Sequence, residues 1–390
     1  MKFNFDENID RRGTHSVKLE KMKALFGRDD LLPLWVADMD FKSPPAITEA
    51  LRKRVDHEIY GYTVAPDAYY HSITAWLAKR HGWQVNSEEI TFVPGVVKGF
   101  AFAIDHFTGK GDKVIIQPPV YHPFRIVTTS LGREVVNNPL LLEEGRYRMD
   151  LDGLRSILSQ QKCKMLILCN PHNPGGRVWS PDELRELAEI CFDHGVFVVS
   201  DEIHADLTLP GYRHTPFATV SENAVSNSLT LMAPSKTFNI AGIVSSFAVI
   251  PDKKIREQYL SYLEPRELNQ GTLFAYTATT AAYEQCGEWL DEMLSYVQGN
   301  IDLVDHFLNE QIPQIRAMRP EASFLMWLDC HGLSLSRSEL TKLFVDRAHL
   351  ALNEGSMFGP GGEGFMRLNV GTPRNVLEKA LNKLKKAIEG

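Results

Sequence analysis

The chain is predicted to be an α/β protein with a mostly parallel, doubly wound sheet and a smaller α+β part. Uniformly apolar runs, typical of parallel strands buried on both faces, occupy residues 165–169 and 196–199, and a short apolar run at 229–232 also predicts a buried strand. Amphipathic helical patterns lie between the predicted strands, and this alternation is typical of doubly wound sheets. We therefore expect a large domain over residues 46–285 with this architecture.

The pattern changes after about residue 285. A long amphipathic helix is predicted around Trp289–Leu308, followed by strands near 324–328 and 364–370 and by a last helix. Residues 1–45 contain few periodic apolar positions, so we expect them to form an arm that wraps other parts of the fold. This arm and residues 286–390 are predicted to form the smaller domain.

Composition excludes several classes of function. The 390 residues are 44% hydrophobic, which is ample for a sizeable core, and the net charge of −7 argues against a nucleic-acid surface. No apolar stretch is long enough to span a membrane, and residues 1–12 carry no signal-peptide pattern. The five cysteines lack C-x-x-C spacing, so we expect no metal site but buried free thiols in a reducing cytoplasm.

Lys236 is the first candidate functional residue. It follows the apolar run 229–232 and precedes another at 246–250, on a tight turn within Pro234-Ser235-Lys236-Thr237. Burial there disfavours the ammonium form and leaves an amine that can form a Schiff base with an aldehyde. The alternative is an ordinary solvated loop lysine.

Two further loops offer complementary groups. Asp201 and His204 follow the predicted strand 196–199, and Asn173 follows the strand 165–169. Open α/β sheets bind ligands at the carboxyl ends of their strands, where these residues are expected to meet Lys236. An amine, a carboxylate and an amide are the groups that pyridoxal 5'-phosphate (PLP) requires.

A phosphate site is predicted after the strand 90–93. Gly95 permits a sharp turn there, and a helix with apolar periodicity begins near Val96 and Val97. The first N–H groups and the partial positive charge of a helix start favour a phosphate group. The alternative is a simple turn without a ligand.

The order of these motifs resembles the fold-type I, class I and II aminotransferase superfamily. The motifs are Asn-Pro-x-Asn-Pro-x-Gly at 170–176, Asp-Glu-Ile-His at 201–204 and Ser-Lys at 235–236. The segments Asp10-Arg11-x-Gly13-Thr14 and Leu32–Phe41 resemble one subgroup, the bacterial cystathionine β-lyases and C–S lyases, which includes the maltose-regulon modulator proteins. This resemblance runs from about residue 6 to the C-terminus.

The resemblance implies a role for each candidate. Lys236 would carry PLP and transfer the substrate proton, and Asp201 would keep the pyridine nitrogen protonated. Asn173 would donate to the ring oxygen and contact the substrate carboxylate. Tyr121, after the strand 114–117, would stack on the ring as a third catalytic residue, although a tyrosine there often just packs on its own strand.

Two more residues take their roles from the resemblance. Arg367, a charge among apolar neighbours in the strand 364–370, would bind the substrate α-carboxylate in two places. The alternative is an internal salt bridge with an acid. Tyr62 would reach the cofactor phosphate of the neighbouring subunit, which implies a homodimer with shared sites; the alternative is a loop anchor.

Some positions depart from the family pattern. Val244 stands where many members have an arginine for the phosphate, and Ala233 replaces a frequent serine. His204 replaces a tyrosine near the ring 3-oxygen, where we expect it to tune the electronics of the ring. The phosphate is therefore expected to rely on the following groups: the backbone N–H groups of Val96 and Val97, Ser235, and Tyr62 from the second subunit.

Three functions fit these residues. The first is a PLP-dependent lyase that cleaves the C–S bond of L-cystathionine or another cysteine S-conjugate and releases a thiol, pyruvate and ammonia. The second is an aminotransferase that uses the same residues, and nothing in the sequence separates the two chemically. The third is a regulatory binding protein that retains the fold. Against it, the sequence keeps the complete set of catalytic candidates, namely Lys236, Asp201, Asn173 and Arg367.

Overall fold

The computed structural model describes residues 2–390 and shows an α/β fold whose largest sheet has seven strands. The strand order is β2-β10-β9-β8-β7-β3-β4. In that order the strands span Ile90–Val93, Ser246–Val249, Ser228–Met232, Phe197–Asp201, Met165–Cys169, Lys113–Ile116 and Glu134–Asn137. Neighbouring strands are parallel except that β10 runs antiparallel to β2 and β9. The predicted mostly parallel sheet is confirmed.

Helices cover both faces of this sheet, which explains the uniformly apolar strands. Successive side chains of a strand point to opposite faces. On β7, Met165 and Ile167 pack into one apolar cluster, whereas Leu166 and Leu168 pack into another. The first cluster includes α5 (Val96–Phe107), α6 (Pro123–Ser130) and α11 (Lys253–Leu263), and the second includes α7 (Leu151–Gln160), α8 (Pro181–Asp193) and α9 (Glu222–Ser226).

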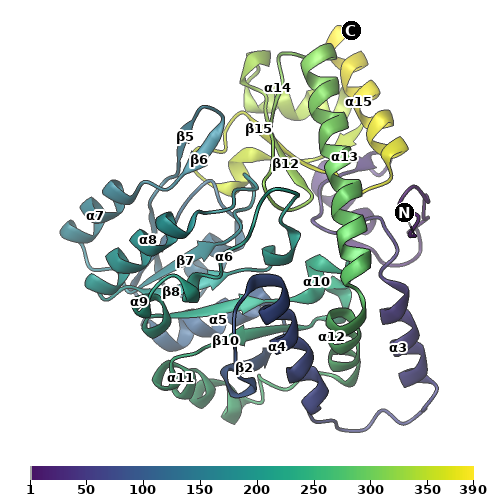
Figure 1. The fold of residues 1–390 in the computed structure, drawn as a ribbon. Coiled ribbons are helices and arrows are strands. Elements are labelled where there is room, and N and C mark those ends of the chain that lie inside the picture. Colours follow the sequence, from purple (N-terminus) through teal and green to yellow (C-terminus); the bar gives the residue numbers. More distant parts are fainter. Residues whose placement is uncertain (1) are drawn as a thin grey trace.

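A second, four-stranded antiparallel sheet has the order β11-β12-β15-β14. Its strands span Arg316–Met318, Leu325–Asp329, Phe365–Asn369 and Asn353–Glu354. The long helix α13 (Gly287–Gln311) lies beside the last helix α15 (Arg374–Glu389), as Figure 1 shows, and α14 (Arg337–Lys342) belongs to the same part. The predicted helix around Trp289–Leu308 is confirmed and is longer by a few residues at each end.

The N-terminal arm joins this second part of the fold. It contains two short helices, α1 (Val17–Glu20) and α2 (Met22–Phe26), and the strand β1 (Leu32–Pro33). Strand β1 pairs in parallel with β13 (Leu350–Ala351). A strand from the beginning of the chain thus completes structure near its end, which fits an arm that wraps other parts of the molecule.

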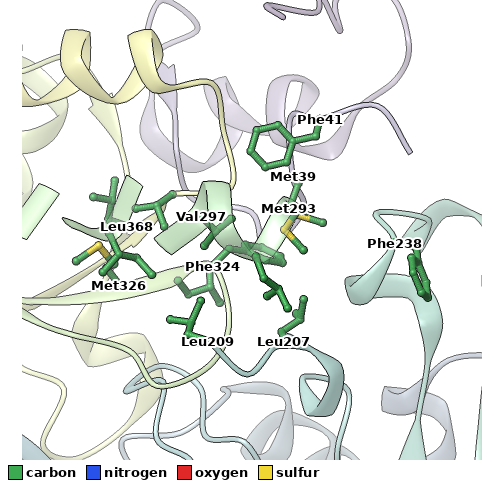
Figure 2. Packing of buried hydrophobic residues seen from close by; sticks show 14 of the residues in the cluster. Met39, Phe41, Leu207, Leu209, Phe238, Met293, Val297, Phe324, Met326 and Leu368 are labelled. Carbon is green, nitrogen blue, oxygen red and sulfur yellow. The ribbon is translucent and has the colours of Figure 1, made fainter. Parts of the chain in front are cut away.

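One large hydrophobic core connects the two parts. Figure 2 shows Met326 and Leu368, which face each other in the smaller sheet, near Phe324. Leu207 and Leu209, which follow β8 of the large sheet, belong to the same cluster. The division into domains at 45/46 and 285/286 stays a prediction; its second boundary falls where α12 (Leu273–Gln285) meets α13.

The remaining elements frame the large sheet. Helix α12 packs against α3 (Pro45–Val55) and α4 (Asp67–His81), β5 (Leu141–Glu143) pairs with β6 (Arg146–Arg148), and α10 (Pro234–Thr237) forms a single turn between β9 and β10. All five cysteines are buried and free, as predicted. Among residues 2–390, no helix is long and apolar enough to cross a membrane, and no cluster of His, Cys, Asp or Glu has the form of a metal site.

Candidate active site

A cavity of about 640 Å³ lies where the strands of the large sheet end and meet the smaller sheet and the arm. It brings together most of the residues predicted from the sequence. The predicted residues that line it are Val96, Val97, Tyr121, Asn173, Asp201, His204, Ser235, Lys236 and Arg367. Tyr62 does not line it and is fully exposed on the chain's surface.

Lys236 lies on the single turn α10, which Pro234 starts, directly after β9. Its Nζ donates a hydrogen bond to the backbone oxygen of Ala37 in the N-terminal arm. Burial lowers the pKa of Lys236 to about 8, with the opposing charges of Asp38 and Asp201 limiting the fall and Arg367 adding to it. The solvated-lysine alternative is therefore wrong, because a substantial fraction of this amine is neutral near pH 8.

Asp201 ends strand β8, where the register pairs it with Cys169 of β7 and Leu231 of β9. Its Oδ1 accepts a hydrogen bond of 3.2 Å from the backbone N–H of Ile203. Burial raises the pKa of Asp201 to about 7, although the Ile203 N–H and Lys236 favour the charged form. A cation that binds next to this carboxylate would restore its charge.

Arg367 on β15 is buried and has no carboxylate partner among residues 2–390. It donates to Asn173 Oδ1 at 3.2 Å, to Asn353 Oδ1 at 2.7 Å and to the backbone oxygen of Trp35 at 2.9 Å. Its Nε has no partner, and burial lowers the pKa of Arg367 to about 10. The internal salt bridge is therefore wrong, and this fork has room for an external carboxylate.

Tyr121 and His204 complete the polar lining near Asp201. Burial raises the pKa of Tyr121 to about 12, so its hydroxyl stays protonated at neutral pH, and its ring contacts Phe124 edge-on. Burial lowers the pKa of His204 to about 3, and the cations Lys236 and Arg367 add to the shift. His204 is thus neutral, and its buried Nδ1 has no hydrogen-bond partner.

The predicted phosphate end is built on the start of α5. Gly95 precedes it with φ of +113°, a region that L side chains rarely adopt, and the first N–H groups of the helix have no carbonyl partner within it. Val244 also lines the cavity and has φ of +57°, which is unusual for a β-branched residue. Lys98, Ser245 and Ser246 line the cavity too, although no sequence motif pointed to them.

The residues present fit PLP. Lys236 offers an amine for the aldehyde, Asp201 a carboxylate for the ring nitrogen, and the N–H groups at the start of α5 a place for the phosphate. The unpartnered Nδ1 of His204 and Nε of Arg367 are buried polar atoms that a ligand can satisfy.

Some of the lining could not be inferred from residue types. The backbone oxygens of Trp35 and Ala37 bind Arg367 and Lys236, and a backbone carbonyl carries no residue-specific signal. Val17 and Leu25, which are exposed apolar residues of α1 and α2, form part of the cavity wall. The arm was predicted only to wrap the fold, and its place at the cavity is a finding of the structure.

The chain is similar over nearly its whole length to two bacterial proteins. It is 46% identical to "Cystathionine beta-lyase PatB" of Bacillus subtilis over 99% of this chain and 100% of that one. It is 33% identical to "Protein MalY" of Escherichia coli over 99% of each chain.

A solved structure shares both fold and cofactor class. Cystalysin from Treponema denticola, whose crystal structure contains pyridoxal 5'-phosphate, matches with a TM-score of 0.96 at 34% identity, over 100% of this chain and 99% of that one. The family model for aminotransferases of class I and II matches residues 29–384. The chain therefore belongs to the class I and II aminotransferase family.

Proposed function

We propose that this protein is a PLP-dependent carbon–sulfur β-lyase that cleaves L-cystathionine or related cysteine S-conjugates. The reaction adds one water and yields a thiol, pyruvate and ammonia. The observation that carries the choice of reaction is the 46% identity to a cystathionine β-lyase over the full length of both chains. The half-buried Lys236 and the buried Asp201 and Arg367 line one cavity and supply the groups that the reaction requires.

Substrate binding follows from the contacts of Arg367. Its guanidinium group is held by Asn173 and Asn353 and lacks a carboxylate partner among the described residues, so we assign it the α-carboxylate of the substrate. The low local polarity strengthens this ion pair. Asn173 accepts a hydrogen bond from the Arg367 guanidinium group and would contact both the substrate carboxylate and the cofactor.

The proton steps fall to Lys236. PLP, when bound, supplies an electron sink that stabilises negative charge on the substrate α-carbon. With a pKa of about 8, the Lys236 amine is suited to take the α-proton near neutral pH. Asp201 holds a proton on the pyridine nitrogen, and Tyr121 lies in the cavity where it can cover the ring. The electron pair left at Cα then expels the sulfur from Cβ as a thiolate.

An assay without a keto acid tests this function. The purified protein, loaded with PLP, is mixed with L-cystathionine, and pyruvate and free thiol are measured together. We expect the two products in a one-to-one ratio. Turnover that requires an added keto acid would instead identify an aminotransferase. If the protein is fully occupied by PLP but catalyses neither reaction, the result would favour the third function, a regulatory binding protein.

We further propose a homodimer with shared active sites. The loop between α3 and α4 extends below the rest of the ribbon in Figure 1. It exposes Ile59 at 67%, Val64 at 83% and the whole Tyr62 side chain. Apolar residues gathered on an exposed loop favour burial against a second chain. Tyr62 would then reach the phosphate end of the second chain's cavity.

Mixed dimers test the shared site. We expect Tyr62→Phe alone to increase cofactor loss on dialysis, because Val244 offers the phosphate no cation. If Tyr62 serves the other chain, a dimer of one Tyr62→Phe chain and one Lys236→Ala chain holds both lesions in one cavity. Its second cavity is intact, so half of the wild-type activity per dimer should return and survive dilution of PLP.

A different result is expected if the active sites are not shared. If Tyr62 serves its own chain, each cavity of the mixed dimer carries one lesion. Its activity would then fall on dilution of PLP as steeply as that of the Tyr62→Phe homodimer, which would contradict the shared site. Absorbance of the bound cofactor, measured beside activity, distinguishes loss of PLP from loss of the dimer.

A cytoplasmic location is proposed from the cysteines. All five are buried and free, and none forms a disulfide among residues 2–390. Free thiols suit a reducing compartment. Fractionation of the native host with an antibody to the protein tests this location.

A further inference from the structure

Lys236 and Asp201 belong to different strands but serve opposite ends of one small ring in the proposed function. Their spacing must therefore be fixed. The ladder between β8 and β9 reaches only to Asp201 and Leu231, where the Glu202 N–H donates to the Leu231 oxygen at 2.8 Å. Asp201 is the last residue of this ladder, whereas Lys236 lies beyond it on the α10 turn, and the segments that follow the two strands separate into independent loops.

A single hydrogen bond reconnects these loops. The hydroxyl of Thr237, the residue after Lys236, donates to Asp206 Oδ2 at 3.0 Å. Among residues 2–390, no other hydrogen bond links the segment 203–209 to the segment 233–240. Neither Thr237 nor Asp206 lines the cavity, so neither is placed to contact the cofactor.

Asp206 is itself held firmly from a third element. Its Oδ1 accepts 2.8 Å hydrogen bonds from Trp76 Nε1 and His81 Nε2, both on α4. Asp206 is only 4% exposed and Thr237 is fully buried. Burial favours the neutral acid, but the hydrogen bonds from His81, Trp76 and Thr237 outweigh it and lower the pKa of Asp206. The acceptor is thus an ionised carboxylate, which makes strong hydrogen bonds.

We propose that the Asp206–Thr237 hydrogen bond is a brace that sets the position of Lys236 relative to Asp201. Asp206 and Thr237 are positioning residues, because they act through the α10 turn and not on the reacting atoms. Small displacements of a reacting group are costly, and a shift of about 1 Å lowers rates by as much as 100-fold. The inference rests on the proposed role of Lys236.

Capture of PLP by cofactor-free protein tests the brace without measuring turnover. Thr237→Val keeps the side-chain shape and removes the hydroxyl, whereas Thr237→Ser keeps the hydroxyl. We expect Thr237→Val to slow covalent capture about tenfold and Thr237→Ser to stay within about twofold of wild type. Capture is followed by absorbance and by borohydride trapping with mass spectrometry. In the loaded enzyme, kcat should fall with the same pattern while KM stays within about twofold.

Variants of Asp206 separate position from charge. Asp206→Asn removes the charge, but its amide can still bond to Thr237, so a brace predicts nearly normal capture. A charge effect predicts the reverse, with a loss in Asp206→Asn and none in Thr237→Val. In an Asp206→Ala background, Thr237→Val should have no further effect, because the bond is already absent. If Asp206→Ala fails to fold, the variants Thr237→Val, Thr237→Ser and Asp206→Asn still distinguish the brace from a charge effect.

Thr108→Val is the matched control. Thr108 is buried, donates to the Ile104 oxygen at 2.6 Å and accepts from Arg133 Nε at 2.9 Å, at the end of α5 away from the cavity. We expect it to lower thermal stability without changing capture. Equal capture by Thr237→Val and wild type overturns the brace alone. Trapping of PLP by the wild type on a different lysine overturns the proposed role of Lys236 as well.

Discussion

Lys236→Ala is expected to lower turnover of L-cystathionine at least about a thousandfold, because it removes the group that binds the aldehyde and the base that takes the α-proton. The effect should lie in kcat, since Arg367 still binds the substrate carboxylate. The measurement is pyruvate release at saturating substrate, with thermal unfolding as a check that the fold is intact. Alanine removes a half-buried, partly charged amine, so stability should not fall with activity.

The wild type supplies the control for this prediction. Borohydride treatment should attach PLP to the peptide that contains Lys236, and the variant should lose that adduct. Because the pKa of Lys236 is about 8, capture of PLP by cofactor-free wild type should accelerate as pH rises through that value. A reduced adduct on another lysine, in either protein, would contradict the assignment.

Sequence reasoning succeeded where position along a strand decides the outcome. Asn173, Asp201 and Lys236 lie at or after the ends of three mainly apolar strands that are neighbours in the sheet. Parallel strands deliver their carboxyl ends to one edge, so residues that follow them meet there. Arg367 could be recognised because a charge within an apolar strand needs a partner.

The sequence could not predict contacts that depend on distant backbone. The arm oxygens of Ala37 and Trp35 bind Lys236 and Arg367 across about 200 and 330 positions of chain, and no periodicity encodes such pairing. The antiparallel direction of β10 could not be predicted from the sequence either, because a buried apolar strand has the same residue pattern in either direction. The brace between Asp206 and Thr237 was missed because both residues are common in loops.

Asp201→Ala is expected to lower kcat/KM for L-cystathionine about 100- to 1,000-fold, the usual cost of losing one preorganised electrostatic contact. The Asp201 carboxylate has a pKa of about 7 in its dry site, and a protonated ring nitrogen beside it would favour the charged form. Without that charge, the ring nitrogen loses its proton and accepts electrons poorly. Asp201→Asn keeps the shape and should lose nearly as much, which assigns the effect to charge.

His204→Phe is the matched control on the same loop, and we expect it to cost less than about tenfold. The pKa of His204, about 3, keeps its ring neutral, so the substitution removes no charge. Its Nδ1 has no partner in the protein, so no hydrogen bond from Nδ1 to another residue is lost. Both variants are assayed for elimination at saturating PLP. Comparable losses of elimination activity in Asp201→Ala and His204→Phe would show that the loop acts through its shape. They would contradict the role assigned to the Asp201 charge.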